Sequence, residues 1–278
     1  MPAPLNYLRT ELAEAWQGQD PLEVAFSLEG EIFRDVPNRR TLKVNIAGRD
    51  YFLKLHYGVG WGEVLKNWLQ FKRPVLGADL EYRAFRALAE EGIPAPIAAG
   101  YASSAGSTAK RRSFVLSDPL VGYTTLEDVV DEWLKHPPTL RQRRQVLRAV
   151  ARFAARFHQA GFVHRDFYVC HILLKDDAWA EGRVELAVLD LHRAQQFAQL
   201  PPRWRHRDLA AMLFSVLDLN LTPAEWLRFV RIYTGLPLRQ ALTDPLWRKV
   251  KRRARRLYAE GLRKQTVKGL ARLEALEP

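Results

Sequence analysis

The hydrophobic and polar positions of this chain change their period along its length. Between residues 31 and 56, apolar and polar residues alternate, which predicts strands over 31–34, 41–46 and 51–56. In the second half, apolar residues recur every three or four positions. The clearest case predicts a helix over 141–160 that ends at Gly161. The other predicted elements are helices over 9–17, 61–73 and 78–91, strands over 113–117 and 183–189, and a helical remainder beyond 207.

This order, strands first and helices later, predicts an α+β fold with two lobes. We expect a small antiparallel-sheet lobe at residues 1–118, with 61–73 as an extra helix, and a mainly helical lobe at residues 119–278. A length of 278 residues is sufficient for one large or two small domains, and a hydrophobic content of 47% is ordinary for a globular protein.

Cysteine content and the lengths of the apolar runs argue against a secreted or membrane-spanning protein. The chain has one cysteine, Cys170, so it forms no intrachain disulfide, which fits a reducing compartment. The first 16 residues contain no apolar run of the signal-peptide type, and no stretch approaches the roughly 18–20 apolar residues that a membrane span needs. We therefore expect a soluble cytoplasmic protein.

Positive charge is concentrated at the C-terminus. The formal net charge is +12, and residues 248–278 hold 11 cations against 3 anions. Such an excess favours a nucleic acid, an anionic membrane surface or an acidic molecule as partner.

A candidate catalytic loop follows the helix over 141–160. It reads His164-Arg165-Asp166, then His171 five residues after the aspartate, then an apolar run. This spacing is typical of protein-kinase-like phosphotransferases, in which the aspartate accepts the proton of the attacking hydroxyl and the later position holds a metal ligand. Kinases use Asn there, and imidazole is a softer ligand than Mg²⁺ prefers. Three roles for His171 therefore stay open: weak metal ligation, contact with a phosphate, or orientation of Asp166.

Three further residues complete a predicted nucleotide site. Lys54 lies in the strand over 51–56, where a lysine can bind phosphates, and Glu81 in the helix over 78–91 can pair with it. Asp190 ends the apolar run 186–189, and a carboxylate there is costly unless it binds a cation such as Mg²⁺ or accepts hydrogen bonds. Each residue alone is an ordinary surface charge or turn residue, but their order and spacing together predict a kinase-like fold.

The remaining predictions concern departures from protein kinases. Asp208 opens an apolar helix, where it either anchors the backbone of the catalytic loop or is a plain charge at the helix N-terminus. No glycine-rich loop precedes Lys54, so Arg39 and Arg40 are candidates to hold nucleotide phosphates. Asp-Leu-His at 190–192 replaces Asp-Phe-Gly, and Arg207 follows so soon that little room is left for a regulated activation loop. These features favour a small-molecule or glycan acceptor.

A family resemblance rests on four segments. They are residues 58–67 with the run Gly-Val-Gly-Trp-Gly-Glu, residues 164–171, residues 189–195 with the run Leu-Asp-Leu-His-Arg-Ala-Gln, and residues 204–211. Over about residues 20–260 the chain resembles the heptose(I) kinases of the lipopolysaccharide core.

The resemblance implies an activity and its site residues. It implies transfer of phosphate from ATP, with Mg²⁺, to O4 of the first inner-core heptose, at the inner face of the inner membrane of a Gram-negative bacterium. It implies that Asp166 is the base, Asp190 the metal ligand, Lys54 the nucleotide lysine, and His171 a family trait. It also implies acyl carrier protein as a possible partner, and a basic enzyme suits a lipid-anchored anionic glycan and an anionic membrane surface.

Two other classes of function stay open at this point. One is a kinase that acts on another core sugar or on a protein. The other is a non-enzyme, either a pseudokinase scaffold or a basic protein that binds nucleic acid or membrane. The presence of Lys54, Asp166 and Asp190 argues against a scaffold, and without a recognised nucleic-acid motif we expect no nucleic-acid partner.

Overall fold

The computed structural model describes residues 6–58, 77–105 and 111–271. The predicted helix over 61–73 and nearly all of the family segment at 58–67 lie outside these residues. The chain divides into two compact units. The first is Met1–Val121 with Asp190–Arg193, and the second is Gly122–Leu189 with Ala194–Pro278.

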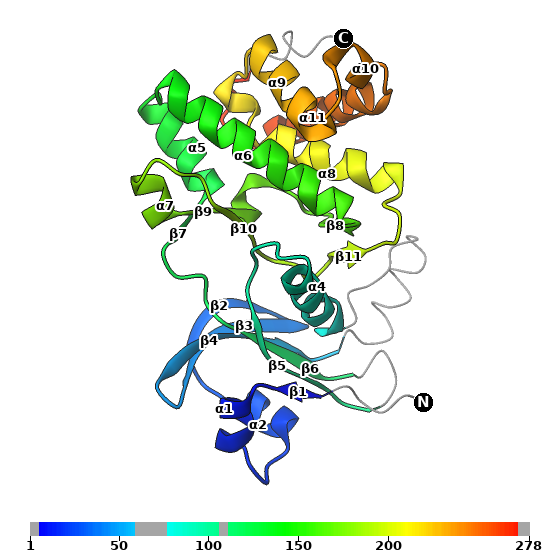
Figure 1. The fold of residues 1–278 in the computed structure, drawn as a ribbon. Helices are drawn as coiled ribbons and strands as arrows, with labels where there is room; N and C mark the ends of the chain where they lie inside the picture. The colour runs from blue at the N-terminus through cyan, green and yellow to red at the C-terminus, as the bar shows by residue number, and fades with distance from the viewer. Residues whose placement is uncertain (1–5, 59–76, 106–110, 272–278) are drawn as a thin grey trace. The chain divides into compact units, whose positions relative to one another are not determined.

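A six-stranded antiparallel sheet forms the body of the first unit (Figure 1). In spatial order the strands are β1 (Tyr7–Leu8), β5 (Ala98–Ser103), β6 (Ser113–Ser117), β4 (Arg49–His56), β3 (Arg39–Ile46) and β2 (Glu31–Val36). The alternating pattern therefore predicted β2, β3 and β4 correctly. It did not predict β5, because the small residues Ala98, Ala99 and Gly100 have low strand propensity although all three are buried.

The two faces of this sheet have different chemistry. Leu42, Val44, Leu53 and Leu55 face a core that includes residues of two helices, α1 (Thr10–Ala15) and α2 (Pro21–Ser27). Figure 1 shows these two helices on one side of the sheet and α4 (Asp79–Glu90) on the other. Because side chains alternate along a strand, Lys54 points to the face opposite Leu53 and Leu55.

The second unit is mainly helical. Its long helices are α5 (Leu126–Lys135), α6 (Leu140–Gln159), α8 (Pro202–Ser215), α9 (Pro223–Thr234) and α11 (Leu246–Arg263), with the short α7 (Asp176–Ala180) and α10 (Leu238–Ala241) and the 3₁₀ turns η1 (Val169–His171) and η2 (Leu217–Leu219). Two small sheets accompany them. One has the order β10 (Leu186–Val188), β9 (Ile172–Lys175), β7 (Tyr123–Thr125), and the other pairs β11 (Gln195–Gln196) with β8 (Phe162–Val163).

Helix α6 leads directly into the candidate catalytic loop. It begins with a capping box in which Thr139 and Gln142 satisfy each other's backbone N–H groups. It ends before Gly161, whose φ of +81° is easily adopted only by glycine. A Cβ at Gly161 would lie 2.0 Å from the Phe197 carbonyl oxygen, so the chain turns here in a space that admits no side chain.

Candidate active site

The candidate catalytic loop is anchored in an aromatic core. Phe157 on α6, Phe162 on β8 and Phe167 next to Asp166 are all fully buried. The Phe157 ring stacks on Phe167 at a centroid distance of 5.2 Å and lies 5.4 Å from Phe162. Burial of Phe167 fixes the backbone on the C-terminal side of Asp166, whose own side chain is half-buried.

Asp208 holds the other side of the loop. Its carboxylate is fully buried and accepts hydrogen bonds from the backbone N–H groups of His164 at 2.7 Å and Arg165 at 2.9 Å. His158 Nε2 lies 3.5 Å from the same carboxylate, and His158 Nδ1 lies 2.8 Å from the Tyr233 hydroxyl. A buried carboxylate requires such partners. This is the anchoring arrangement predicted for Asp208, while His158 and Tyr233 were not singled out from the sequence.

Arg165 in the candidate catalytic loop and Asp190 after strand β10 adopt left-handed backbone conformations. Arg165 has a φ of +73° and Asp190 a φ of +58°, a region that non-glycine residues rarely occupy. Besides its backbone bond to Asp208, Arg165 donates from Nη2 to Gln195 Oε1 at 2.6 Å, and its guanidinium lies 4.5 Å from the Trp204 ring. Backbone strain of this kind persists where surrounding contacts enforce it, commonly at functional sites.

The structure gives His171 a positioning contact. Its Nδ1 lies 2.7 Å from the backbone oxygen of Asp166, so Nδ1 carries a proton and donates to that carbonyl. Its ring stacks on His164 at 5.4 Å. His164 Nε2 in turn donates to the carbonyl of Leu189 at 2.9 Å. Burial lowers the pKa of His164, which is therefore neutral near pH 7.

In the first unit, Lys54 forms a charged cluster. Lys54 Nζ lies 2.6 Å from Glu81 Oε1 on α4 and 3.3 Å from Asp190 Oδ1. Burial lowers the pKa of Lys54, but attraction to these two carboxylates more than offsets burial, and the net pKa is raised above 10.5. Lys54 therefore carries a positive charge at neutral pH. Glu81 is 1% exposed, and its Oε2 has no hydrogen-bond partner within the described residues.

Two histidines border this cluster, and neither was given a role from the sequence. His192 Nδ1 lies 2.7 Å from Asp190 Oδ1, so it orients the carboxylate. His56 is buried two residues after Lys54 on the same strand face. Burial, followed by the charges of Arg39 and Lys54, lowers the pKa of His56 to about 3, so His56 is neutral. The period-2 spacing from Lys54 was the available signal for His56.

The two arginines predicted to hold phosphates lie on different faces of the sheet. Arg39 is paired with His56 across β3 and β4, which places it on the face that carries Lys54. Arg40 is its neighbour in the strand and therefore points to the opposite face, where it forms an ion pair with Asp35 at 2.7 Å. The structure thus brings Arg39, but not Arg40, toward the Lys54 cluster.

The cluster has the donor chemistry for Mg²⁺ beside a nucleotide. Mg²⁺ is commonly bound by one or two carboxylates together with substrate phosphates, and Asp190 provides one carboxylate. Among the described residues no group of three or more His, Cys, Asp or Glu side chains could hold a metal ion by itself. The Asp190 carboxylate fits a metal that binds together with nucleotide phosphates.

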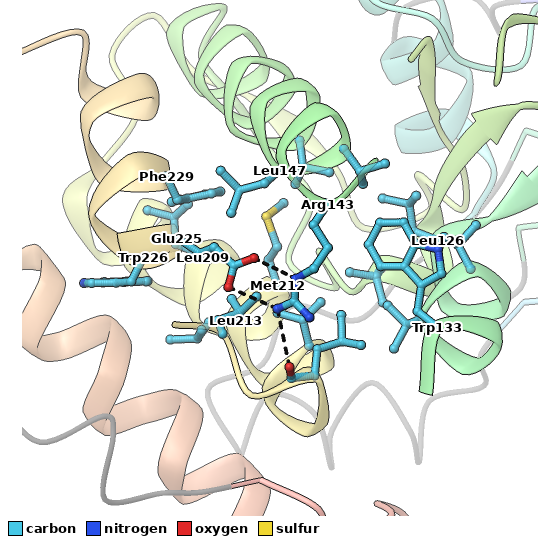
Figure 2. Close-up of a pocket in the computed structure, with 18 of the residues that line it drawn as sticks. Leu126, Trp133, Arg143, Leu147, Leu209, Met212, Leu213, Glu225, Trp226 and Phe229 are labelled. Carbon is cyan, nitrogen blue, oxygen red and sulfur yellow. Dashed lines mark hydrogen bonds and ion pairs between the residues drawn. The ribbon is translucent and has the colours of Figure 1, made fainter. Parts of the chain in front are cut away.

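The helical unit also contains an apolar cavity of about 100 Å³ (Figure 2). Side chains of α5, α6, α8, α9 and α11 line it, among them Trp133, Val150, Met212 and Phe229. Figure 2 shows the one ion pair of its lining, in which Arg143 Nε donates to Glu225 Oε1 at 2.7 Å. The sequence did not predict this cavity, because it arises from five helices that meet only in the folded chain.

The loop anchored by Asp208 and the Lys54–Glu81–Asp190 cluster define a protein-kinase-like phosphotransferase. A model of the lipopolysaccharide kinase (Kdo/WaaP) family matches residues 25–233, and the chain belongs to this family. The predicted family and enzyme class are therefore confirmed.

Relatives extend the match over most of the chain. It is 42% identical over 246 residues to a lipopolysaccharide core heptose(I) kinase WaaP of Pseudomonas aeruginosa, covering 87% of this chain and 92% of that protein. It is 38% identical over 237 residues to the protein of the same name from Escherichia coli K12, covering 85% and 89%. A solved structure titled "WaaP in complex with acyl carrier protein" superimposes with a TM-score of 0.79 at 36% identity, covering 91% of this chain and 99% of that chain. This confirms the predicted kinase-like α+β fold.

Proposed function

We propose that this protein is an ATP-dependent kinase that phosphorylates O4 of heptose I in the lipopolysaccharide inner core. The observation that carries the proposal is the catalytic loop, in which Asp208 and His171 hold the backbone around Asp166 through bonds of 2.7–2.9 Å. The relatives named as heptose(I) kinases support the choice of acceptor, since they match the chain over 84–87% of its length.

The proposed chemistry assigns one role to each charged group of the site. The heptose hydroxyl oxygen attacks the γ-phosphorus of ATP, the bond to the β–γ bridging oxygen breaks, and ADP leaves. Asp166 accepts the hydroxyl proton, which contributes roughly 10²–10⁴-fold in rate. Lys54, charged because of Glu81 and Asp190, binds the nucleotide phosphates. Asp190, oriented by His192, would hold Mg²⁺, and the metal would supply neutralisation of phosphate charge.

We further propose that the protein works peripherally at the inner face of the inner membrane. No helix in the described part of the chain has the length and apolarity to cross a bilayer. The cations of α11 support attraction to an anionic lipid surface, at roughly 1 kcal/mol for each Lys or Arg near the surface.

Acyl carrier protein is the protein partner that we propose. The related WaaP structure was solved with such a carrier, and a net charge of +12 suits an acidic partner. The apolar cavity among α5, α6, α8, α9 and α11 supports the same proposal, because an acyl chain is the kind of ligand that an apolar cavity accepts.

The test of the kinase is an assay on purified protein with ATP, Mg²⁺ and core oligosaccharide whose heptose I is unphosphorylated. Mass spectrometry should find one added phosphate, and fragmentation should place it on heptose I. The Asp166→Asn variant should lose roughly 10²–10⁴-fold in kcat while it still binds ATP. Wild-type turnover by this variant, or transfer to another core sugar or only to a protein, would contradict the proposal.

A further inference from the structure

Five cations lie on α8 and α11, two helices that pack against each other. They are Arg203 and Arg207 on α8 and Lys249, Arg253 and Arg256 on α11. Within the described residues, only Arg256 among these five forms an ion pair with a carboxylate, at 3.5 Å from Glu260. The positive charge of this basic cluster is therefore largely uncompensated.

Trp204 connects the basic cluster to the catalytic loop. The guanidinium groups of Arg207 and Arg203 lie 5.0 and 5.5 Å from the Trp204 ring centroid, and that of Arg165 lies 4.5 Å from it. Arg165 immediately precedes Asp166, so α8 brings the cluster next to the proposed base. Stacking of this kind limits the motion of guanidinium groups and pre-organises them for a ligand.

Arg253 is the half-buried member of the cluster. Its Nε is buried and has no hydrogen-bond acceptor within the described residues. Burial and the charges of Arg207 and Arg256 lower the pKa of Arg253, and Tyr168 of the catalytic loop and Glu260 act on it in the opposite direction. Nearby His206 experiences the same field: burial and the charges of Arg253, Lys249 and Arg207 lower its pKa, against a hydrogen bond with the Pro202 backbone. An anion that binds beside Arg253 would stabilise its charged guanidinium against burial and the neighbouring positive charges.

We infer that the basic cluster binds an acidic group of the acceptor glycan, a carboxylate or a phosphate, beside the hydroxyl that is phosphorylated. This inference rests on the proposed function and adds the chemistry by which the acceptor is recognised. Arginine forks bind the paired oxygens of carboxylates and phosphates in a bidentate manner. Four members of the cluster are exposed, but Arg253 is half-buried with a buried Nε, and Trp204 joins the cluster to Arg165 of the catalytic loop. The position of Arg253 favours a small anion at the loop over a lipid surface or a carrier protein, which would meet the exposed charges.

The test compares Arg253→Gln and Arg207→Gln with a matched control, Arg248→Gln. Arg248 is exposed on the same helix, roughly 140° around the axis from Arg253 at 3.6 residues per turn. We expect Arg253→Gln to raise the KM for core oligosaccharide roughly ten- to hundredfold, the range of a lost hydrogen bond between charged groups, with the KM for ATP unchanged. Arg207→Gln, at an exposed position that tolerates substitution, should act in the same direction, and Arg248→Gln should match wild type.

Modified acceptors distinguish the two possible anions. Wild type is assayed on core oligosaccharide with its carboxylates reduced to alcohols and on core oligosaccharide with its existing phosphates removed. One modification should raise the wild-type KM as Arg253→Gln does, and should add nothing further in that variant.

Three outcomes would overturn the inference: equal KM values for the Arg253 and Arg248 variants, no effect of either modification, or a loss by Arg253→Gln that is confined to binding of anionic vesicles or acyl carrier protein. Wild type that phosphorylates no core acceptor would instead refute the proposed function.

Discussion

At the residue scale, the structure narrows the role of His171. Its Nδ1 donates to the Asp166 carbonyl at 2.7 Å, and its ring stacks on His164. Of the three roles that the sequence left open, orientation of Asp166 is therefore the one with a visible contact. Metal ligation by His171 stays a prediction, and it requires the other ring nitrogen.

Substitution of His171 separates these roles. Asn places its side-chain N–H close to where Nδ1–H lies, so His171→Asn should retain activity within about threefold. His171→Ala removes the hydrogen bond and should lower kcat roughly five- to tenfold, the value of about 1 kcal/mol. Titration of activity against Mg²⁺ provides the check: the concentration needed for half-maximal rate should be unchanged in both variants. A large rise in that concentration would identify His171 as a metal ligand.

At the scale of elements, the link between strand β4 and helix α4 determines the charge of the nucleotide lysine. Lys54 on β4 is buried, which lowers its pKa, and Glu81 on α4 is the largest opposing influence. Because the folded-state pKa is raised above 10.5, interactions of the charged lysine persist at neutral pH and are lost only as the pH rises through that raised value.

Glu81→Gln should therefore lower the pKa of Lys54, because the effect of burial is then opposed by one carboxylate instead of two. The alkaline limb of kcat/KM for ATP should move to lower pH, because the pKa of Lys54 falls when one of its two carboxylates is removed. The control is Asp79→Asn in the first turn of the same helix, where the partly exposed Asp79 carboxylate lies 3.7 Å from Arg83, and this variant should keep the wild-type profile. If the two variants share one alkaline limb, Glu81 does not set the charge of Lys54.

Some helices and strands could be predicted from the sequence and others could not. Alternation predicted β2, β3 and β4, and helical spacing predicted α6, because each pattern extends over several residues. The hydrophobic pattern did not reveal α2, because this seven-residue helix depends on an Asp20 cap and a proline at its start. Side chains such as His158 and Tyr233 were missed because packing of distant segments, not local sequence, brings them to Asp208.

At the scale of the whole molecule, each compact unit carries its own part of the chemistry. The first contains the Lys54–Glu81–Asp190 cluster, and the second contains Asp166, its anchor Asp208, the basic cluster and the apolar cavity. The helical unit thus has two features that phosphoryl transfer alone does not require. One is polar and adjoins the catalytic loop, and the other is apolar and lined by helices.

The cavity predicts that an acylated partner stabilises the folded protein. A ligand that binds only the native state adds stability of about 2.7 kcal/mol at a concentration of 100 times its Kd. Acyl carrier protein that bears a long acyl chain should therefore raise the Tm of the purified protein, as followed by calorimetry. Carrier protein without the acyl chain should raise it less, because the apolar surface of the cavity then stays unfilled.

A cavity-filling variant tests whether this effect arises at the cavity. Val150→Phe adds apolar volume from α6 into a space lined by Trp133, Met212 and Phe229. Without a partner, the Tm of this variant should stay within a few degrees of the wild-type Tm, since the added ring occupies an existing void. With acylated carrier protein, the additional rise in Tm produced by the acyl chain should be abolished. Val121→Phe, at a position 80% exposed, is the control and should respond like wild type. If Val150→Phe keeps the full acyl-dependent shift, the acyl chain binds elsewhere and the cavity is only a packing defect among five helices.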